Sequence, residues 1–223
     1  MKKIVLVAMI ILASGCKENN TGIDKKVINK AYSDCKSSLT DSLKSPSSLK
    51  ISSAEVRQMM PGIEQIYASY GKNMIEDGKI VDYFITDQYR FRTLGVGINY
   101  EAQNSFGVSL RGNYVCTYLY SIDKELKSPS SFYLTMIKAG TDTVYPFSSI
   151  DDIDSASSFT INSDIKSISS SNDLSYSKRD KEVYGELIEL DKSTKREQEA
   201  EELRQSWKNN VKNDFQGANL SGI

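Results

Sequence analysis

The stretch from Phe91 to Tyr120 constrains the fold of this chain more than any other. Phe91 to Tyr100 is rich in β-forming residues, and Asn104 and Gly107 are residue types that accept a positive φ in a turn. From Gly107 onward, the apolar residues alternate and fall on one side of a strand: Val108, Leu110, Tyr114, Cys116, Tyr118 and Tyr120. The sequence therefore predicts an antiparallel hairpin with Cys116 on its apolar side.

An amphipathic helix is predicted upstream of this hairpin. Apolar residues recur there at steps of three and four, which is typical of one helix face: Ile28, Ala31, Tyr32, Cys35, Leu39 and Leu43. Ser45-Pro46 ends the helix, because proline disfavours the α conformation of the residue before it. A strand follows from Leu49, with one slip in its alternation.

Cys35 and Cys116 both lie on faces that we expect to be buried. A helix packed on an antiparallel sheet would bring these faces together, so we predict a disulfide; two separate buried thiols are the alternative. The bond would close a loop of about 80 residues and stabilise the fold by roughly 4–4.5 kcal/mol on the chain-entropy model. The predicted fold class is α+β, with the N-terminal helix packed on an antiparallel sheet.

The first sixteen residues have the pattern of a secretory signal. Lys2-Lys3 is followed by the apolar run Ile4 to Leu12 and then by the small residues Ala13-Ser14-Gly15 before Cys16. The run is shorter than the about 20 apolar residues that a bilayer span needs. A short membrane anchor is the alternative interpretation.

Leu12-Ala13-Ser14-Gly15-Cys16 resembles the lipobox of bacterial lipoproteins, with Ala13 where leucine is commonest. The resemblance implies that residues 1–15 are a signal peptide, that Cys16 carries palmitate or similar acyl chains, and that residues 16–24 form a lipidated tether to the bilayer. Lys17 stands where enterobacterial lipoproteins of the inner membrane carry aspartate, which implies an outer-membrane location in the cell envelope. An oxidising compartment of this kind favours the Cys35–Cys116 disulfide.

Residues 25–121 resemble a functionally uncharacterised domain of bacterial lipoproteins and membrane-tethered proteins. The resemblance rests on Cys35 in the helix, the LKxPSS motif at Leu43–Ser48, the DAQNSFG motif at residues 101–107 and the YxC motif at Tyr114–Cys116, with Glu101 in place of the usual aspartate. It implies no activity. The hexapeptide LKSPSS recurs at Leu126–Ser131, where we expect it to end a helical turn and start a strand rather than to mark a duplicated domain.

The rest of the chain gives a coarser division. A second helix is predicted from Ile63 to Met74, and Phe132–Lys138 and Thr143–Phe147 are predicted to form a second hairpin, which completes an α+β domain over residues 25–147. Residues 148–177 read as a Ser/Asp-rich linker. Residues 178–215 read as a charged C-terminal helix, which either is simply solvated or uses Trp207 and its neighbours to dock a partner.

Composition excludes several function classes. The chain has no histidine, which removes Ser-His-Asp and Cys-His catalysis and His-ligated zinc, and no basic stripe accompanies its net charge of −1, so nucleic acid is not expected. We expect no enzyme activity, cofactor or metal. The favoured function is non-enzymatic binding of another envelope component in an assembly, exclusion or immunity role. The alternatives are a cell-wall glycan-binding module that uses Tyr114, Tyr118 and Tyr120, and, less favoured, a carboxylate-based hydrolase.

Overall fold

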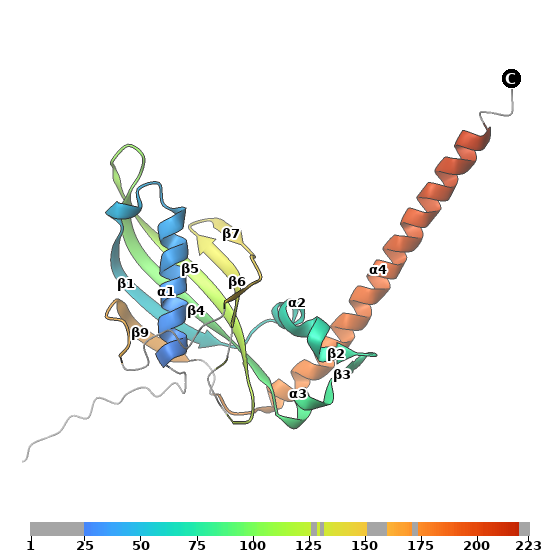
Figure 1. Ribbon diagram of the computed structural model, residues 1–223, viewed down its shortest axis with the longest axis horizontal. Helices are drawn as coiled ribbons and strands as arrows, with labels where there is room; N and C mark the ends of the chain where they lie inside the picture. Colours follow the sequence, from blue (N-terminus) through green and yellow to red (C-terminus); the bar gives the residue numbers. More distant parts are fainter. Residues whose placement is uncertain (1–24, 126–128, 130–131, 151–159, 171–173, 219–223) are drawn as a thin grey trace, which may run out of the picture.

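A computed structural model describes residues 25–125, 129, 132–150, 160–170 and 174–218. Helix α1 (Lys25–Ser42) lies on one face of a curved sheet, and a smaller layer of helices packs at one end of that sheet (Figure 1). The C-terminal helix α4 (Lys178–Ala218) starts in this smaller layer and then projects away from the body. The predicted α+β class is confirmed.

The main sheet is mostly antiparallel and has the order β7-β6-β5-β4-β1-β9, with β8 also paired to β6. Its strands are β1 (Lys50–Met59), β4 (Arg90–Gln103), β5 (Ser109–Ile122), β6 (Phe132–Ala139), β7 (Asp142–Val144), β8 (Ser148–Ile150) and β9 (Ile165–Ser170). Only β9 pairs in parallel, along the outer edge of β1. Two short strands, β2 (Ile75–Glu76) and β3 (Lys79–Ile80), form a separate hairpin.

The predicted central hairpin is present as β4 and β5, paired from Arg90 opposite Ile122 to Gln103 opposite Ser109. The second predicted hairpin is formed by β6 and β7. The slip expected at the start of β1 is a shift of register between Ile51 and Ser53. Helix α1 ends at Ser42, before the predicted Ser45-Pro46 stop, and Pro46–Ser48 forms a separate 3-10 turn.

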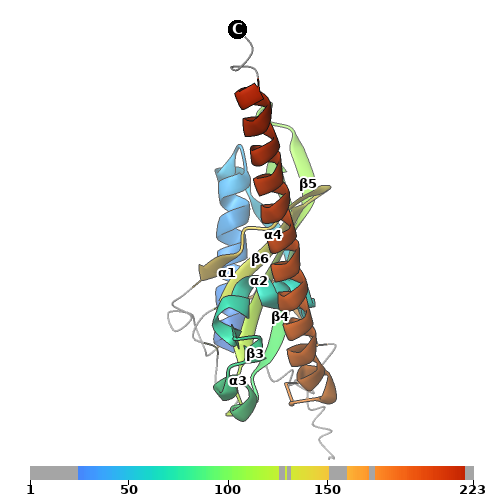
Figure 2. The ribbon, with the colours of Figure 1, turned by 90° about the vertical axis from the view of Figure 1, so that its right-hand side faces the viewer.

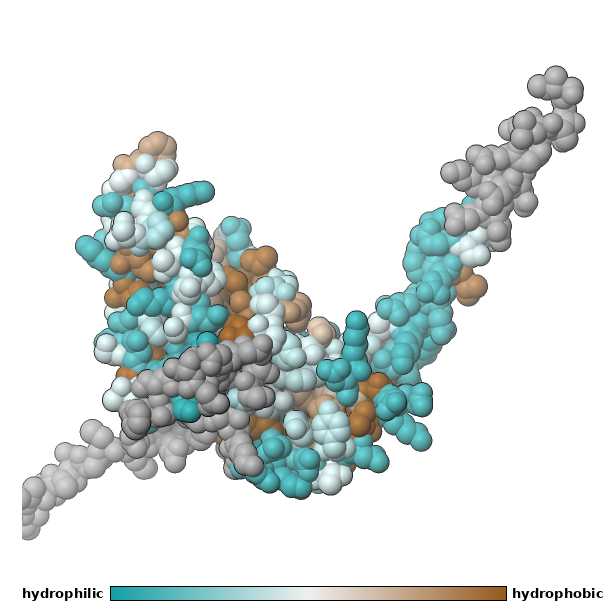
Figure 3. All heavy atoms as spheres, viewed as in Figure 1, coloured by the Kyte–Doolittle hydropathy of each residue, from teal (hydrophilic) through white to brown (hydrophobic). Residues whose placement is uncertain are grey.

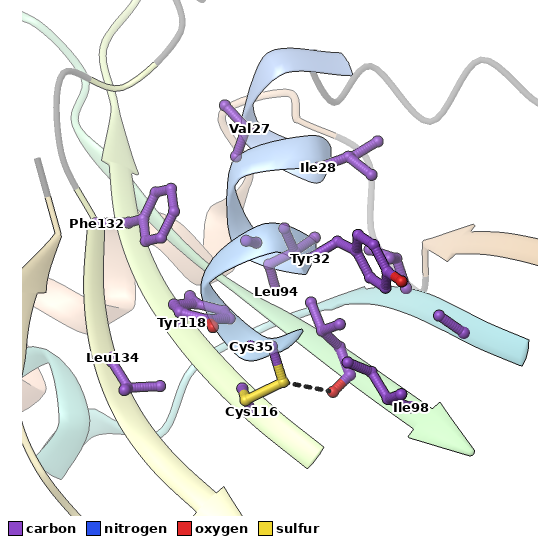
Figure 4. Close-up of a cluster of buried hydrophobic side chains, with 14 of the residues drawn as sticks. Val27, Ile28, Tyr32, Cys35, Leu94, Ile98, Cys116, Tyr118, Phe132 and Leu134 are labelled. Atoms are coloured by element: carbon purple, nitrogen blue, oxygen red, sulfur yellow. Dashed lines mark hydrogen bonds between the residues drawn. A yellow bond between two sulfur atoms is a disulfide. The ribbon is translucent and has the colours of Figure 1, made fainter. Parts of the chain in front are cut away.

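The main core lies between α1 and the sheet (Figure 4). The apolar face predicted for the helix is buried, and its contributors from α1 are Val27, Ile28, Ala31, Tyr32, Cys35 and Leu39. They meet alternate side chains of β4, such as Leu94, Val96 and Ile98, and the side chains of β5 and β6 on the same side. Because all these residues are buried, the helix and the sheet are held together mainly by apolar contact.

A second apolar cluster covers one end of the other side of the sheet. It joins α2 (Ile63–Met74), whose bounds match the prediction, α3 (Asp82–Thr86) and the first turns of α4. Val183, Tyr184 and Leu187 of α4 are buried there, and the Tyr184 hydroxyl donates to the Phe84 carbonyl oxygen at 2.9 Å. Figure 2, which looks onto α4, shows α2 and α3 beside its first half.

A buried ion pair fixes the start of α4 to the sheet. Arg92 Nη1 of β4 lies 2.6 Å from Asp180 Oδ1, and both side chains are 1% exposed. Ser177 and Asp180 also form a capping box: the Ser177 amide donates to Asp180 Oδ2 at 2.8 Å, and the Asp180 amide donates to Ser177 Oγ at 3.3 Å. Asp180 therefore caps the first turn of the helix and anchors it to the sheet.

The prediction that residues 148–177 form a linker is wrong for two stretches. Ser148–Ile150 is strand β8, and Ile165–Ser170 is strand β9. Both lie at sheet edges, where the backbone ladder holds the strand and few apolar side chains are needed; in β9 these are Ile165 and Ile168. Residues 151–159 and 171–173 lie outside the described residues, and the domain boundaries drawn from the sequence remain predictions.

Candidate functional site

The predicted disulfide joins Cys35 of α1 to Cys116 of β5. Both residues are fully buried in the main core, and Figure 4 shows the bond beneath the helix. The two cysteines are 81 residues apart in the sequence, so the bond ties the first helix to the middle of the sheet. Its role is structural. The proposed lipidation site, Cys16, and the signal and tether of residues 1–24 lie outside the described residues.

The three tyrosines predicted as a glycan-binding face lie in the core instead. Tyr114, Tyr118 and Tyr120 are between 0% and 4% exposed, because they belong to the core cluster between the sheet and α1. The Tyr118 hydroxyl donates to Asp34 Oδ2 of α1 at 2.8 Å, and burial followed by the Asp34 charge raises the pKa of Tyr118. The three rings are therefore not accessible to a sugar in this structure, which counts against the predicted glycan-binding face.

The sequence motifs meet at one end of the sheet and shape it. Ser48, from the first LKSPSS copy, accepts a hydrogen bond from the Gln103 amide at 2.8 Å, which ties the 3-10 turn to the end of β4. Asn104 Oδ1 accepts from the amides of Phe106 and Val108 at 2.9 and 3.0 Å, and Gly107 has a φ of +77°. The motif residues therefore build a turn. Most of the second LKSPSS copy lies outside the described residues.

This turn carries exposed apolar side chains on a protruding hairpin. Phe106 is 88% exposed, Val108 55% and Leu110 54%. The hairpin extends past the end of α1 in Figure 1, and brown atoms gather at its tip in Figure 3. The hairpin extends past α1 because its strands are longer than the helix. The 14 residues of β4 span about 46 Å, whereas the 18 residues of α1 span about 27 Å. The predicted burial of Val108 and Leu110 is therefore wrong.

A pocket of about 410 Å³ adjoins this tip. It lies between the end of α1, the β4–β5 hairpin and the β6–β7 turn. Its lining combines apolar groups from Leu43, Tyr100 and Leu110 with the polar side chains of Asn104 and Arg111. We call this pocket, together with Phe106, Val108 and Leu110, the hairpin-end surface. Pockets of this size, with mixed lining, can accept a protruding side chain or a small ligand.

The second exposed feature is the outer part of α4. Every side chain from Lys195 to Lys208 is exposed, and these include Leu203 at 72% and Trp207 at 68%. The structure thus confirms a protruding, charged C-terminal helix and places Trp207 on its surface. Figures 1 and 2 show this part of α4 standing clear of the body.

No protein-family model, curated protein or solved structure matches the chain. Among the residues that the structure describes, no three His, Cys, Asp or Glu side chains are grouped as metal ligands. Within the same residues, no helix is both long and apolar enough to cross a membrane. Among the described residues, the hairpin-end surface and the outer part of α4 each expose apolar side chains and are candidate binding surfaces.

Proposed function

We propose that the chain is a lipid-anchored, non-enzymatic protein of the bacterial outer membrane that binds another envelope protein through its hairpin-end surface. The observation that carries the proposal is the exposure of Phe106, Val108 and Leu110 beside the 410 Å³ pocket. Contiguous exposed apolar residues on a folded domain are typical of interaction sites. The role would be one of assembly, exclusion or immunity.

The chemistry of the surface favours a protein partner over a cell-wall glycan. A glycan-binding face would use Tyr114, Tyr118 and Tyr120, and these rings are enclosed by the core. The hairpin-end surface instead offers an exposed phenylalanine next to a pocket with apolar walls. An aromatic side chain that docks into a partner, beside a pocket that receives a side chain in return, is the arrangement of an interface hot spot.

The position of the hairpin agrees with an anchor at the N-terminus. Lys25 starts α1 at one end of the body, and the β4–β5 hairpin lies beyond the other end of that helix (Figure 1). A lipid at Cys16, nine residues before Lys25, would leave the hairpin-end surface pointing away from the bilayer. A partner could then reach it without competing with the membrane.

Site-specific photo-crosslinking in whole cells tests this function. A photoreactive residue at Val108 should give one discrete adduct with an envelope protein, and Phe106→Asp in the same chain should abolish that adduct. The matched control carries the photoreactive residue at Glu76, an exposed site on the β2–β3 hairpin, and should give no adduct. No adduct at Val108, or the same adduct at both sites, would refute the proposal.

A further inference from the structure

The exposed apolar residues of the outer part of α4 form a stripe on one side of the helix. At 3.6 residues per turn, Ala200, Leu203 and Trp207 fall within a sector of about 60°. The buried residues of the inner part of α4, such as Leu187 and Asp191, point to roughly the opposite side of the helix. In Figure 3 the brown atoms on this part of α4 lie on the side away from the body.

In the part of the chain that the structure describes, the body therefore does not cover this stripe. The side of outer α4 that continues the buried face of the inner part is polar, with Thr194, Gln198 and Gln205 along it. A helix that merely extended into solvent would need no apolar residues at all on its far side. The stripe thus points to a surface outside this chain.

We propose that outer α4 pairs with the same helix of a second copy of this chain as a short, parallel coiled coil. Ala200, Leu203 and Trp207 have the three-and-four spacing of core positions a, d and a. The flanking charges fit a parallel pair of identical helices, in which each g position meets the e position five residues further along the other helix. Lys192 of one copy would meet Glu197 of the other, and Glu199 would meet Arg204.

Each of these contacts occurs twice about a two-fold axis, and all four join opposite charges. In the single chain, Lys192 Nζ lies 2.9 Å from Glu189 Oε1, and Arg204 Nη1 lies 3.3 Å from Glu201 Oε2. Surface ion pairs of this kind contribute about 0–1 kcal/mol each, so exchanging partners costs little. The parallel orientation agrees with two copies on one bilayer but does not require the lipid anchor.

Sedimentation of the purified chain from Lys17 to Ile223 over a range of concentrations tests the pairing. We expect a monomer–dimer equilibrium, and Trp207, the sole tryptophan, should shift its emission to shorter wavelength as the dimer forms. Trp207→Ala and Leu203→Asp should sediment as monomers with unchanged circular dichroism, because both side chains are exposed in one copy. A chain that stays monomeric throughout, or whose tryptophan emission is independent of concentration, would overturn the proposal.

A charge exchange separates specific pairing from general stickiness. Glu199→Arg alone should weaken the dimer about tenfold, because the new guanidinium of each copy then faces Arg204 of the other. Adding Arg204→Glu should restore the affinity, since the pairs are again opposite in sign. Gln198→Arg, on the opposite side of the helix, is the control and should leave the dimer unchanged. Failure of the double variant to recover would contradict the parallel register.

Discussion

The Arg92–Asp180 pair shows how much the packing of α4 depends on one contact. Both side chains are 1% exposed, so each charge is far more costly without the other than with it. Burial alone would raise the pKa of Asp180, but the hydrogen bonds from Arg92 and Ser177 outweigh it and hold the pKa below its ordinary value. The carboxylate is therefore charged at neutral pH and holds the first turn of α4 in place.

Asp180→Asn should destabilise the protein by about 3–5 kcal/mol at pH 7, because it leaves a buried guanidinium without its carboxylate. The measurement is urea unfolding. Since the folded-state pKa of Asp180 is depressed, the carboxylate stabilises the fold above the ordinary pKa of about 3.9 and this contribution is lost as the pH falls further. The difference in unfolding free energy between the parent chain and Asp180→Asn should therefore shrink in acid.

The double variant Arg92→Met with Asp180→Leu serves as the control for this prediction. It removes both charges and keeps apolar volume, so it should be closer in stability to the parent chain than Asp180→Asn is. Equal loss of stability in the two variants would show that the contact acts through shape and not through charge.

Single residues also show where the sequence pattern stops being informative. The alternation in β5 places Leu110 on the same side as Tyr114, Cys116 and Tyr118, and Val108 comes just before the strand. Alternation does not reveal how far the covering helix reaches, however. Helix α1 is too short to cover Val108 and Leu110, which stay exposed. The disulfide could be predicted because both cysteines lie centrally on their elements, whereas the exposed tip depends on the relative lengths of helix and strands.

At the level of elements, α4 has an inner structural part and an outer exposed part. Leu187 is fully buried against α2 and α3, whereas Leu203, on the same helix, is 72% exposed. The sequence predicted the whole helix and its charge, because helical spacing and composition are local properties. It did not separate the two parts, because burial of the inner turns depends on side chains from other elements.

Substitution of each of these two leucines by alanine tests the difference between the inner and outer parts of α4. Leu187→Ala should cost about 2–5 kcal/mol, because it opens a cavity in the second apolar cluster. Leu203→Ala should change the stability of the single copy by less than about 0.5 kcal/mol. Thermal unfolding at low protein concentration is the measurement, so that contact between copies does not contribute. Similar losses at both positions would mean that outer α4 packs on its own chain.

Strand β9 shows a different limit of prediction. Its sequence, Ile165–Ser170, contains four polar residues and reads as a connection. Its position is fixed by backbone pairing with β1, and the Ala54 amide donates to the Asp164 carbonyl oxygen at 2.7 Å at the start of this contact. A neighbour far earlier in the chain therefore decides its structure, and no local pattern in the sequence reports such a neighbour.

For the molecule as a whole, the proposed membrane location depends on one residue. Cys16→Ser should abolish incorporation of radiolabelled palmitate and release the chain from the membrane fraction, because no other cysteine sits in a lipobox-like sequence. A chain that lacks both Cys35 and Cys116 is the control and should keep the label. Continued labelling of Cys16→Ser would contradict the anchor.

The position of the disulfide has a mechanical consequence for a chain held at its N-terminal end. A pull on Lys25 enters α1, reaches Cys35 and crosses the bond directly to Cys116 in β5. The stretch between the two cysteines, residues 36–115, includes β1, α2 and all of β4 and does not carry the load. Tension between the two ends of the chain therefore does not pass through the hairpin tip, so Phe106, Val108 and Leu110 keep their arrangement while the rest of the chain is strained.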